Sequence, residues 1–330
     1  MKDIATKVGV STALVSYVMN GLEKEKRVSE KLTKQIREVA KELNYQPNQI
    51  ARSLRRGSTM TIGLMLADIA NPFFASIARV IEDEAAKQGY VVIFGSSDES
   101  AAKSETLMHT FYDRQVDGLI IMPAEGTDNQ IKQLTKRKIP FVLVDRYFPN
   151  LAANHVVLDN YNASVMAVNH FVEKGFKRIG IIAYKSTMVH MRNRISGFTD
   201  AMSTHNLQET CFVTEIDYNY IQEEVENAIL NFVVNENKVD ALLFATNSLT
   251  TSGLYCIKKY DIKVPNQLAI IGFDGSESFD FFYSPVTCLK QPIVDMGKET
   301  VKVLLDLLND SAELNQIAFQ PSLVIRDSCG

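Results

Sequence analysis

The chain has 330 residues, of which 46% are hydrophobic and 22% are charged, with a formal net charge of −4. This size and composition predict a globular protein with one large or two medium α/β domains and a small additional module. The longest apolar runs, IGLMLA and LIIM, are much shorter than the roughly 20 residues of a membrane-spanning helix. We therefore expect no membrane span.

The start of the chain, MKDIATKVGVS, lacks the continuous apolar segment of a secretory signal, which predicts a cytoplasmic protein. The four cysteines (Cys211, Cys256, Cys288 and Cys329) show no CxxC spacing. Such scattered cysteines are typical of reduced thiols rather than of a disulfide framework or a metal site. We expect neither a metal nor a cofactor.

The charge is divided unevenly along the chain. Residues 1–56 contain 12 Lys and Arg against 6 Asp and Glu, whereas residues 57–330 contain 23 against 33. The first segment is therefore a candidate binder of polyanions, and the remainder is not. A basic surface alone is more often only solvated, so the local pattern has to decide.

Three short helices are predicted in the basic segment. Ile4, Ala5 and Val8 form one apolar face of a helix that ends at Gly9. Ser11 has the position of an N-cap for a second helix, STALVSYVMN, and a third helix opens at Ser29. Their inward-facing residues are Leu14, Val15, Val18 and Met19, then Leu32, Ile36, Val39, Ala40 and Leu43. The pattern favours a helix-turn-helix and a generic three-helix bundle about equally.

Longer motifs separate these two possibilities. The patterns KDIA, GVS, VSxVxN, LNYxPNxIARSL and TIGLxLxDIxNPFF occur in this order from residue 2 to residue 74. In this respect the chain resembles the LacI/GalR family of bacterial transcription regulators, and the resemblance continues to the C-terminus. It implies an N-terminal all-α helix-turn-helix head (1–46), a hinge helix or linker (47–57), and a two-lobed α/β domain (58–330) like periplasmic binding proteins.

The resemblance also implies which residues of the head contact DNA. Thr12, Ala13 and Tyr17 match positions that contact base edges, and Ser11, Ser16, Asn20, Tyr45 and Asn48 match positions that hold phosphates. Tyr17 departs from the Arg or His often found at its position. The loop GLEKEKR, residues 21–27, is longer than is usual in the family; it either contacts DNA or is a solvated loop, and the second interpretation is preferred.

The implied hinge corresponds to Pro47–Arg56. Ten residues do not form a stable helix alone. The resemblance implies that this segment folds on operator DNA beside the hinge of a second subunit and inserts Leu54 into a minor-groove step. Ala51, Arg52 and Arg55 are its other predicted DNA contacts. The alternative is a flexible basic linker.

After residue 58 the hydrophobic pattern alternates between strands and helices, which predicts doubly wound parallel sheets. Predicted strands include TIGLMLA, YVVIFG, DGLIIM and IPFVLVD, and the pattern restarts near HVVLDN before RIGIIA, DALLFA and LAIIGF. We therefore predict two lobes. The first comprises about 58–157 and 289–317, and the second about 158–288 and 318–330.

Polar residues at the carboxyl ends of such strands form ligand sites. The predicted effector contacts, which match family positions in NPFF, VDR, RxSGF, ATN and GFD, are Asp68, Phe73, Phe74, Asp145, Arg146, Arg194, Asn247, Asp274 and Gln291. Gln291 alternatively only organises the hinge between lobes. Acids, an arginine, an amide and aromatic faces suit a polyhydroxylated ligand. Without the resemblance, Asp145 and Asp274 would be interpreted as loop or capping carboxylates.

Two departures from the family pattern bear on the effector. Ser248 and Gly275 stand where the family often has Asp, so the sequence does not indicate one of the familiar hexoses as the effector. Lys185, Arg192 and Arg194 leave a sugar phosphate open, and a nucleoside or nucleobase is a further alternative.

Enzymatic function is not indicated. The chain has no G-x-G-x-x-G after its first predicted strand and no G-x-x-x-x-G-K-[ST] loop, and its five histidines lie in unrelated surroundings. An extracytoplasmic solute-binding protein would share the two-lobed fold. Such a protein would carry a secretory signal and no DNA-binding head, which does not match this sequence. We therefore predict a homodimeric, DNA-binding transcription repressor that is controlled by a carbohydrate-like effector.

Overall fold

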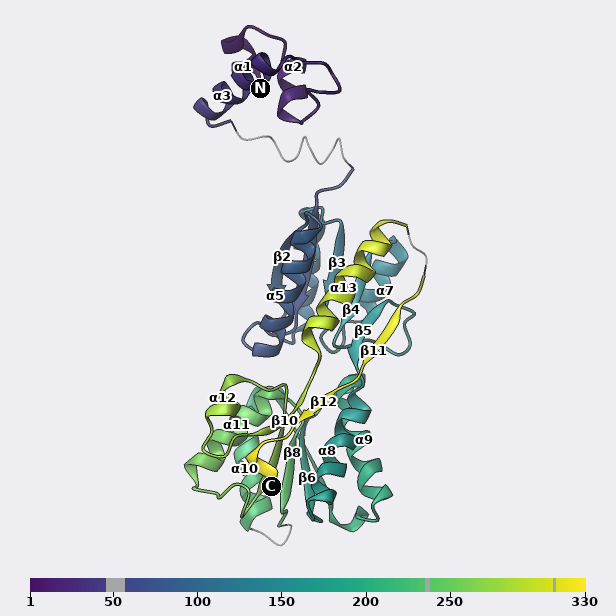
Figure 1. Ribbon diagram of the computed structural model, residues 1–330. Helices are drawn as coiled ribbons and strands as arrows, with labels where there is room; N and C mark the ends of the chain where they lie inside the picture. Colours follow the sequence, from purple (N-terminus) through teal and green to yellow (C-terminus); the bar gives the residue numbers. More distant parts are fainter. Residues whose placement is uncertain (46–56, 235–237, 311–312) are drawn as a thin grey trace. The chain divides into compact units, whose positions relative to one another are not determined.

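The computed structural model describes residues 1–45, 57–234, 238–310 and 313–330, and the chain divides into two compact units, Met1–Thr59 and Met60–Gly330 (Figure 1). Most of the predicted hinge, with Asn48, Ala51, Arg52, Leu54 and Arg55, lies outside the described residues.

The first unit contains the three predicted helices, α1 (Lys2–Val8), α2 (Thr12–Met19) and α3 (Glu30–Glu42). Helix α1 ends at Gly9, whose φ of 75° is the left-handed conformation that glycine adopts without strain. The side chains of Ser11 and Ser29 accept hydrogen bonds from the backbone N–H groups of Leu14 and Leu32, as expected for N-caps.

The buried core of this unit consists of Ile4, Ala5, Val15, Val18, Ile36 and Ala40. The other predicted inward-facing residues, Val8, Leu14, Met19, Leu32 and Val39, are partly buried against it, whereas Leu43 is 41% exposed. Helix α3 ends at Glu42 and Leu43 is its C-cap, so the inward-facing stripe stops one turn earlier than its spacing predicted.

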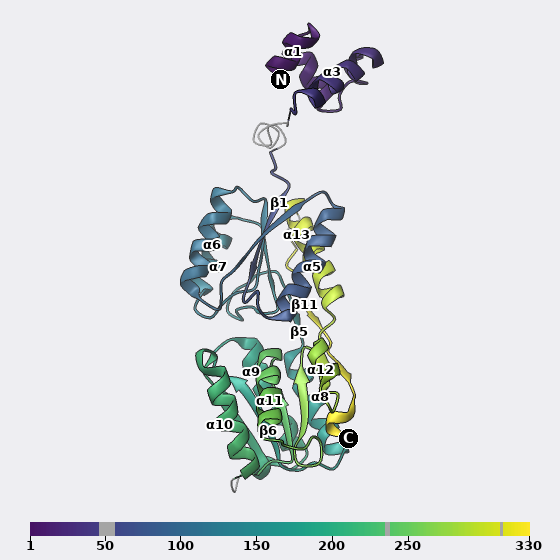
Figure 2. The same ribbon diagram turned by 90° about the vertical axis from the view of Figure 1, so that its left-hand side faces the viewer.

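The first lobe of the second unit is built on six parallel strands in the order β11-β5-β4-β3-β1-β2. Its elements are β1 (Thr61–Leu66), α5 (Pro72–Lys87), β2 (Val91–Ser96), α6 (Ala101–Asp113), β3 (Gly118–Ile121), α7 (Asp128–Arg137), β4 (Phe141–Val144), β5 (His155–Leu158), α13 (Ile293–Leu308) and β11 (Gln316–Phe319). Helices α6 and α7 cover one face of the sheet, and α5 and α13 cover the other (Figure 2).

The second lobe repeats this plan, with the order β12-β10-β9-β8-β6-β7. Its elements are α8 (Asn160–Glu173), β6 (Ile179–Tyr184), α9 (Val189–Thr204), β7 (Cys211–Ile216), α10 (Ile221–Val234), β8 (Ala241–Phe244), α11 (Asn247–Lys259), β9 (Ala269–Phe273), α12 (Glu277–Phe281), β10 (Thr287–Lys290) and β12 (Ser322–Val324). The sheets are parallel as predicted, except that the edge strand β12 runs antiparallel to β10.

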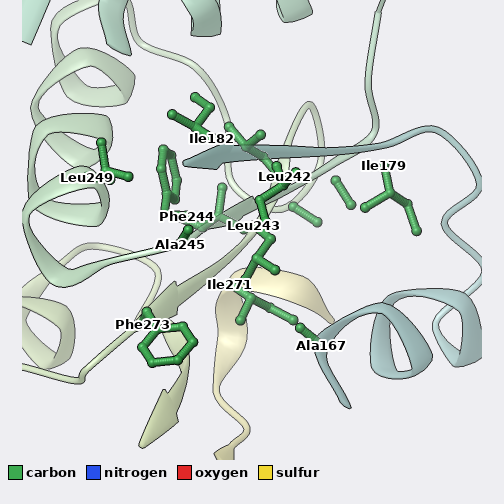
Figure 3. Packing of buried hydrophobic residues seen from close by; sticks show 14 of the residues in the cluster. Ala167, Ile179, Ile182, Leu242, Leu243, Phe244, Ala245, Leu249, Ile271 and Phe273 are labelled. Carbon is green, nitrogen blue, oxygen red and sulfur yellow. The ribbon is translucent and has the colours of Figure 1, made fainter. Parts of the chain in front are cut away.

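The second lobe also holds the largest hydrophobic core, in which side chains from its central strands pack against helix residues (Figure 3). Leu242, Phe244 and Ile271 are fully buried there. Strands buried on both faces read as continuous apolar runs, which is why β8 and β9 were predictable from DALLFA and LAIIGF. The half-exposed edge strand β7, whose sequence is CFVTEI, was not predicted.

The chain crosses between the lobes near the expected positions, but two boundaries differ. Strand β10 extends to Lys290 and pairs with β9 and β12, so the chain leaves the second sheet after Lys290 rather than near 288. Strand β11 continues to Phe319 in the first sheet, two residues past the predicted limit. The strand–helix pattern of the sequence restarts at β5, near HVVLDN. This strand nevertheless belongs to the first sheet, because it pairs with β4 and β11.

Three further findings concern the described residues only. None of their helices is both long and apolar enough to span a membrane. Nowhere among them do three His, Cys, Asp or Glu side chains gather into a potential metal site. All four cysteines are free thiols.

Candidate functional site

Helix α2 presents all three predicted base-reading residues, Thr12, Ala13 and Tyr17, on the surface of the first unit. Ser11, Thr12 and Ala13 are exposed, and the Tyr17 side chain is 37% exposed. Val15 and Val18 fix the opposite face of the helix in the core. A helix held in this way offers a rigid polar face to a groove of DNA.

Asn20 and Tyr45, two of the predicted phosphate contacts, make hydrogen bonds within the head. The Asn20 side chain donates to the Ser16 carbonyl (2.6 Å) and to Ser16 Oγ (3.2 Å). The Tyr45 N–H donates to the Ala40 carbonyl (2.8 Å), and its ring packs against the core. The structure therefore gives both residues a role in shaping the head.

The predicted cleft residues of the second unit begin with two equivalent aspartates. Asp145 follows β4 and Asp274 follows β9, which hold the same place in the two strand orders. Their φ angles are 66° and 55°, a left-handed conformation that is uncommon for a residue other than glycine. Each N–H donates to the neighbouring strand, Asp145 to Val156 (3.0 Å) and Asp274 to Leu289 (2.9 Å). Backbone outliers of this kind gather at functional sites.

Arg146 is held by carboxylates of its own lobe. Its guanidinium donates to both oxygens of Glu99 (2.6 and 2.7 Å), and its Nε donates to Asp145 (3.2 Å). The guanidinium carbon also lies 5.5 Å from the centre of the Phe74 ring. Burial alone would lower the pKa of Arg146, but Glu99 and Asp145 raise it, so the arginine stays charged.

Arg194 is the corresponding cation of the second lobe, and it is 3% exposed. It donates to Asn160 Oδ1 (2.8 Å) and to the Ala245 carbonyl (2.5 Å), and its guanidinium carbon lies 3.6 Å from the centre of the Phe273 ring. Burial lowers its pKa, and the nearby carboxylates of Asp274 and Asp145 partly offset this.

The second aspartate organises the two predicted amides. Gln291 donates to Asp274 Oδ1 (2.8 Å), and the Asn247 side chain donates to the Asp274 carbonyl (2.6 Å). Gln291 Oε1 is buried and has no hydrogen-bond partner among the described residues. Burial raises the pKa of Asp274 to about 6 despite the proximity of Arg194.

Hydrogen bonds between the lobes border the cleft. Tyr218 donates to Asp68 (3.0 Å), and its ring lies against Tyr184, with 5.4 Å between the ring centres. Glu125 of the first lobe accepts from Ser186 Oγ (2.8 Å) and from the Thr187 N–H (3.1 Å) of the second. These contacts hold the lobes in the arrangement described here.

His190 was missed by the sequence prediction. It is 7% exposed, and its Nδ1 has no hydrogen-bond partner among the described residues. Burial lowers its pKa well below the ordinary value, and the charges of Arg146 and Arg194 add to this effect, so the imidazole is neutral. Its position four residues before Arg194 on α9 was the available signal, because residues at that spacing share a helix face.

These side chains surround a small cavity of about 40 Å³. It brings together seven of the nine predicted effector residues, namely Asp68, Phe73, Phe74, Asp145, Arg146, Arg194 and Asp274, with the unpredicted Asn71, Glu99, Tyr184, His190, Met191, Tyr218, Thr246 and Ser248. Asn247 and Gln291 line an adjoining open hollow of about 1260 Å³, which also includes Asp68, Phe73 and Asp274. The inner cavity holds little more than a water molecule, whose share of liquid volume is about 30 Å³, so a sugar-sized ligand requires the lobes or the inner side chains to move.

Comparisons with known proteins match both parts of the chain. A family model described as "Bacterial regulatory proteins, lacI family" matches residues 1–48, and one described as "Periplasmic binding protein-like domain" matches residues 168–329. The "Probable HTH-type transcriptional regulator EndR" of Paenibacillus polymyxa is 30% identical and covers 96% of this chain and 94% of its own.

Two further relatives cover nearly the whole chain. The "Ribose operon repressor" of Haemophilus influenzae is 27% identical, with 99% of this chain and 98% of the relative covered. The crystal structure of the lac repressor dimer bound to operator and the anti-inducer ONPF has a TM-score of 0.87 at 22% identity, covering 99% of this chain and 98% of that one, and it shows a shared fold.

Proposed function

Because this chain belongs to the lacI family of bacterial regulatory proteins, we propose that it is a transcriptional repressor whose affinity for operator DNA is controlled by a carbohydrate-like effector. Helix α2 and its N-cap supply the DNA-reading surface, and the cleft between the two lobes supplies the effector site. The protein is a regulator without catalytic activity and acts where the DNA is, in the cytoplasm.

One observation supports the effector site above the others. Asp145 and Asp274 face one cavity from equivalent strand ends, and the buried Nδ1 of His190 beside them has no hydrogen-bond partner within the described part of the chain. A buried polar group without a partner is costly unless a ligand or water completes it. The site is thus prepared for a ligand that both donates and accepts hydrogen bonds.

The charges favour a neutral, hydroxyl-rich ligand over a phosphorylated one. Four carboxylates line the cavity (Asp68, Glu99, Asp145 and Asp274) against two arginines, and Arg146 is already engaged by Glu99. A phosphate would add negative charge to this excess of acids. Hydroxyl groups can donate to the aspartates and accept from Arg194, and Phe73 and Phe74 offer apolar faces to sugar C–H groups.

Family membership also supports the assembly. We propose a homodimer in which each head reads one half of a roughly palindromic operator, with the hinge segment 47–57 folding on DNA and inserting Leu54 into the minor groove. The lac repressor structure is a dimer on operator and supports this arrangement by analogy. The two lobes of each subunit, with the crossings near 158 and 290, would transmit their relative orientation to the hinges.

The test is a ligand screen followed by a linkage measurement. Thermal unfolding of the full chain is measured with sugars, sugar phosphates, nucleosides and nucleobases, and the affinity for operator is then measured with and without the stabilising compound. We expect a neutral sugar to shift the unfolding midpoint and to change operator affinity by about 5- to 150-fold. A shift with nucleosides or nucleobases alone would overturn the ligand class, and unchanged operator affinity would overturn the switch.

A further inference from the structure

The stretch that contains the recognition helix is uncharged. Residues 8–22 include no Asp, Glu, Lys, Arg or His, and helix α2 lies wholly within this stretch. DNA binding nevertheless depends on cations that neutralise backbone phosphates. The positive charge near this surface therefore comes from outside residues 8–22.

The loop from Gly21 to Val28, which follows α2, is folded by its own backbone. Its N–H groups donate from Leu22 to Tyr17 (2.9 Å), from Lys26 to Leu22 (2.9 Å) and from Val28 to Glu23 (2.8 Å). Gly21, with a φ of 73°, allows the sharp exit from the helix. Residues 24–27 of the loop are exposed, and its backbone has a defined shape.

An ion pair fastens this loop to α3. Glu23 accepts from Arg37 at 2.8 Å, and the Glu23 side chain is only 20% exposed. Val28 packs against the core of the head. The middle of the loop is therefore held between two anchored ends.

This fold brings Lys26 to the recognition helix. Lys26 Nζ lies 5.9 Å from the centre of the Tyr17 ring, within the range of a cation–π contact. It also contacts Glu25 at 2.8 Å, with 42% and 63% of the two side chains exposed. An exposed pair of this kind contributes little, so Lys26 can exchange Glu25 for a stronger anionic partner.

We propose that Lys26 binds a backbone phosphate of operator DNA beside the position read by Tyr17. Loop 21–28 holds Lys26 there and so supplies the charge that α2 lacks. The ring of Tyr17 orients the long lysine side chain, which lowers the entropy lost when it binds. This inference rests on the proposed DNA-binding function and assigns a role to a loop that its sequence left open.

The test compares Lys26→Ala with Lys24→Ala, a matched control in the same loop. Lys24 is exposed and lines a groove with Thr33 and Arg37 of α3 instead of contacting Tyr17. Binding of the full-length dimer is measured against salt concentration on two duplexes. One carries an operator selected by the wild type from random-sequence DNA, and the other is an unrelated duplex of equal length.

For Lys26→Ala we expect the slope of log affinity against log salt to fall by about 0.9 for each head. At about 0.15 M salt the affinity should fall roughly fivefold for each head. Lys24→Ala should leave the salt slope and the affinity nearly unchanged. Glu25→Gln should raise affinity, because it removes a negative charge that competes with the phosphate.

The outcomes separate this inference from the proposed function. Suppose that the wild type selects an operator but Lys26→Ala keeps the wild-type salt slope, or that Lys24→Ala lowers affinity and slope as much as Lys26→Ala does. Then the proposed phosphate contact is refuted, and the regulator function stands. A changed base preference with an unchanged slope would also overturn it, since this indicates a base contact. If the wild type selects no sequence at all, the DNA-binding function itself fails.

Discussion

The head and the cleft handle charge in opposite ways. On the head, α2 is neutral, and Lys26 at its side is exposed and forms an ion pair with Glu25. In the cleft, Arg146 and Arg194 are 8% and 3% exposed and each makes several hydrogen bonds. Exposed charges keep their hydration, and their interactions are screened by salt. Buried charges lose hydration free energy on folding, but they are oriented in advance and are screened much less by salt. One surface is therefore suited to a polyanion, and the other to a single small ligand.

The largest expected contrast is in salt dependence. Raising salt from about 50 to about 200 mM should lower operator affinity by roughly 10³- to 10⁵-fold if the dimer makes about six to ten phosphate contacts. The affinity for a neutral effector should change less than about twofold, because the cleft charges already have protein partners. Titrations of both ligands in the same buffers check this. An effector affinity that falls steeply with salt would indicate an anionic effector and weaken the contrast.

Removing a buried cation should be the most damaging single change in the cleft. Arg194→Met leaves the carboxylate of Asp274 without its nearby cation and leaves Asn160 Oδ1 without its donor. We expect the free energy of unfolding of the second unit to fall by about 3 kcal/mol, with loss of effector binding. Chemical denaturation and calorimetric titration measure the two effects.

The matched control is Arg192→Gln on the same helix. Arg192 is exposed and forms an ion pair with Glu215. Replacing Arg192 should change the free energy of unfolding by less than about 1 kcal/mol, because an exposed ion pair contributes little. Equal losses for the two variants would show that burial does not distinguish these arginines.

A smaller effect is expected from Asp274→Asn, and it should depend on pH. Burial raises the pKa of Asp274 to about 6, whereas an unfolded aspartate titrates near about 3.9. Between these values the unfolded chain loses the proton first, so stability that is full below about pH 4 declines as the pH rises to about 6. Asparagine keeps the acceptor for Gln291 without titrating.

The Asp274→Asn variant should therefore be more stable than the wild type above about pH 6, by about 2 kcal/mol, while its effector affinity falls. Denaturation at several pH values between about 4 and 7 gives the difference directly. A difference that stays constant over this range would mean that Asp274 is ionised throughout, as a close pairing with Arg194 would require.

Local patterns were sufficient for most elements and for the list of cleft residues. Ser11 and Ser29 begin α2 and α3 as predicted, because helix caps depend on neighbours in sequence. The failures are at edges. Strand β7 is half exposed, β12 runs antiparallel, and Leu43 lies just beyond its helix, since burial there is decided by distant partners.

The sequence by itself determined the family, the order of the lobes and most of the polar residues at the strand ends, since these depend on periodicity and short motifs. Only the tertiary structure joined Arg146 to Glu99, turned His190 into the cleft and placed Lys26 against Tyr17. Arg146 and Glu99 are 47 residues apart in sequence. Their pairing depends on strand order and loop shape, which no local pattern contains. The same reason turned the loop after α2 from a solvated connection into a candidate part of the DNA-binding surface.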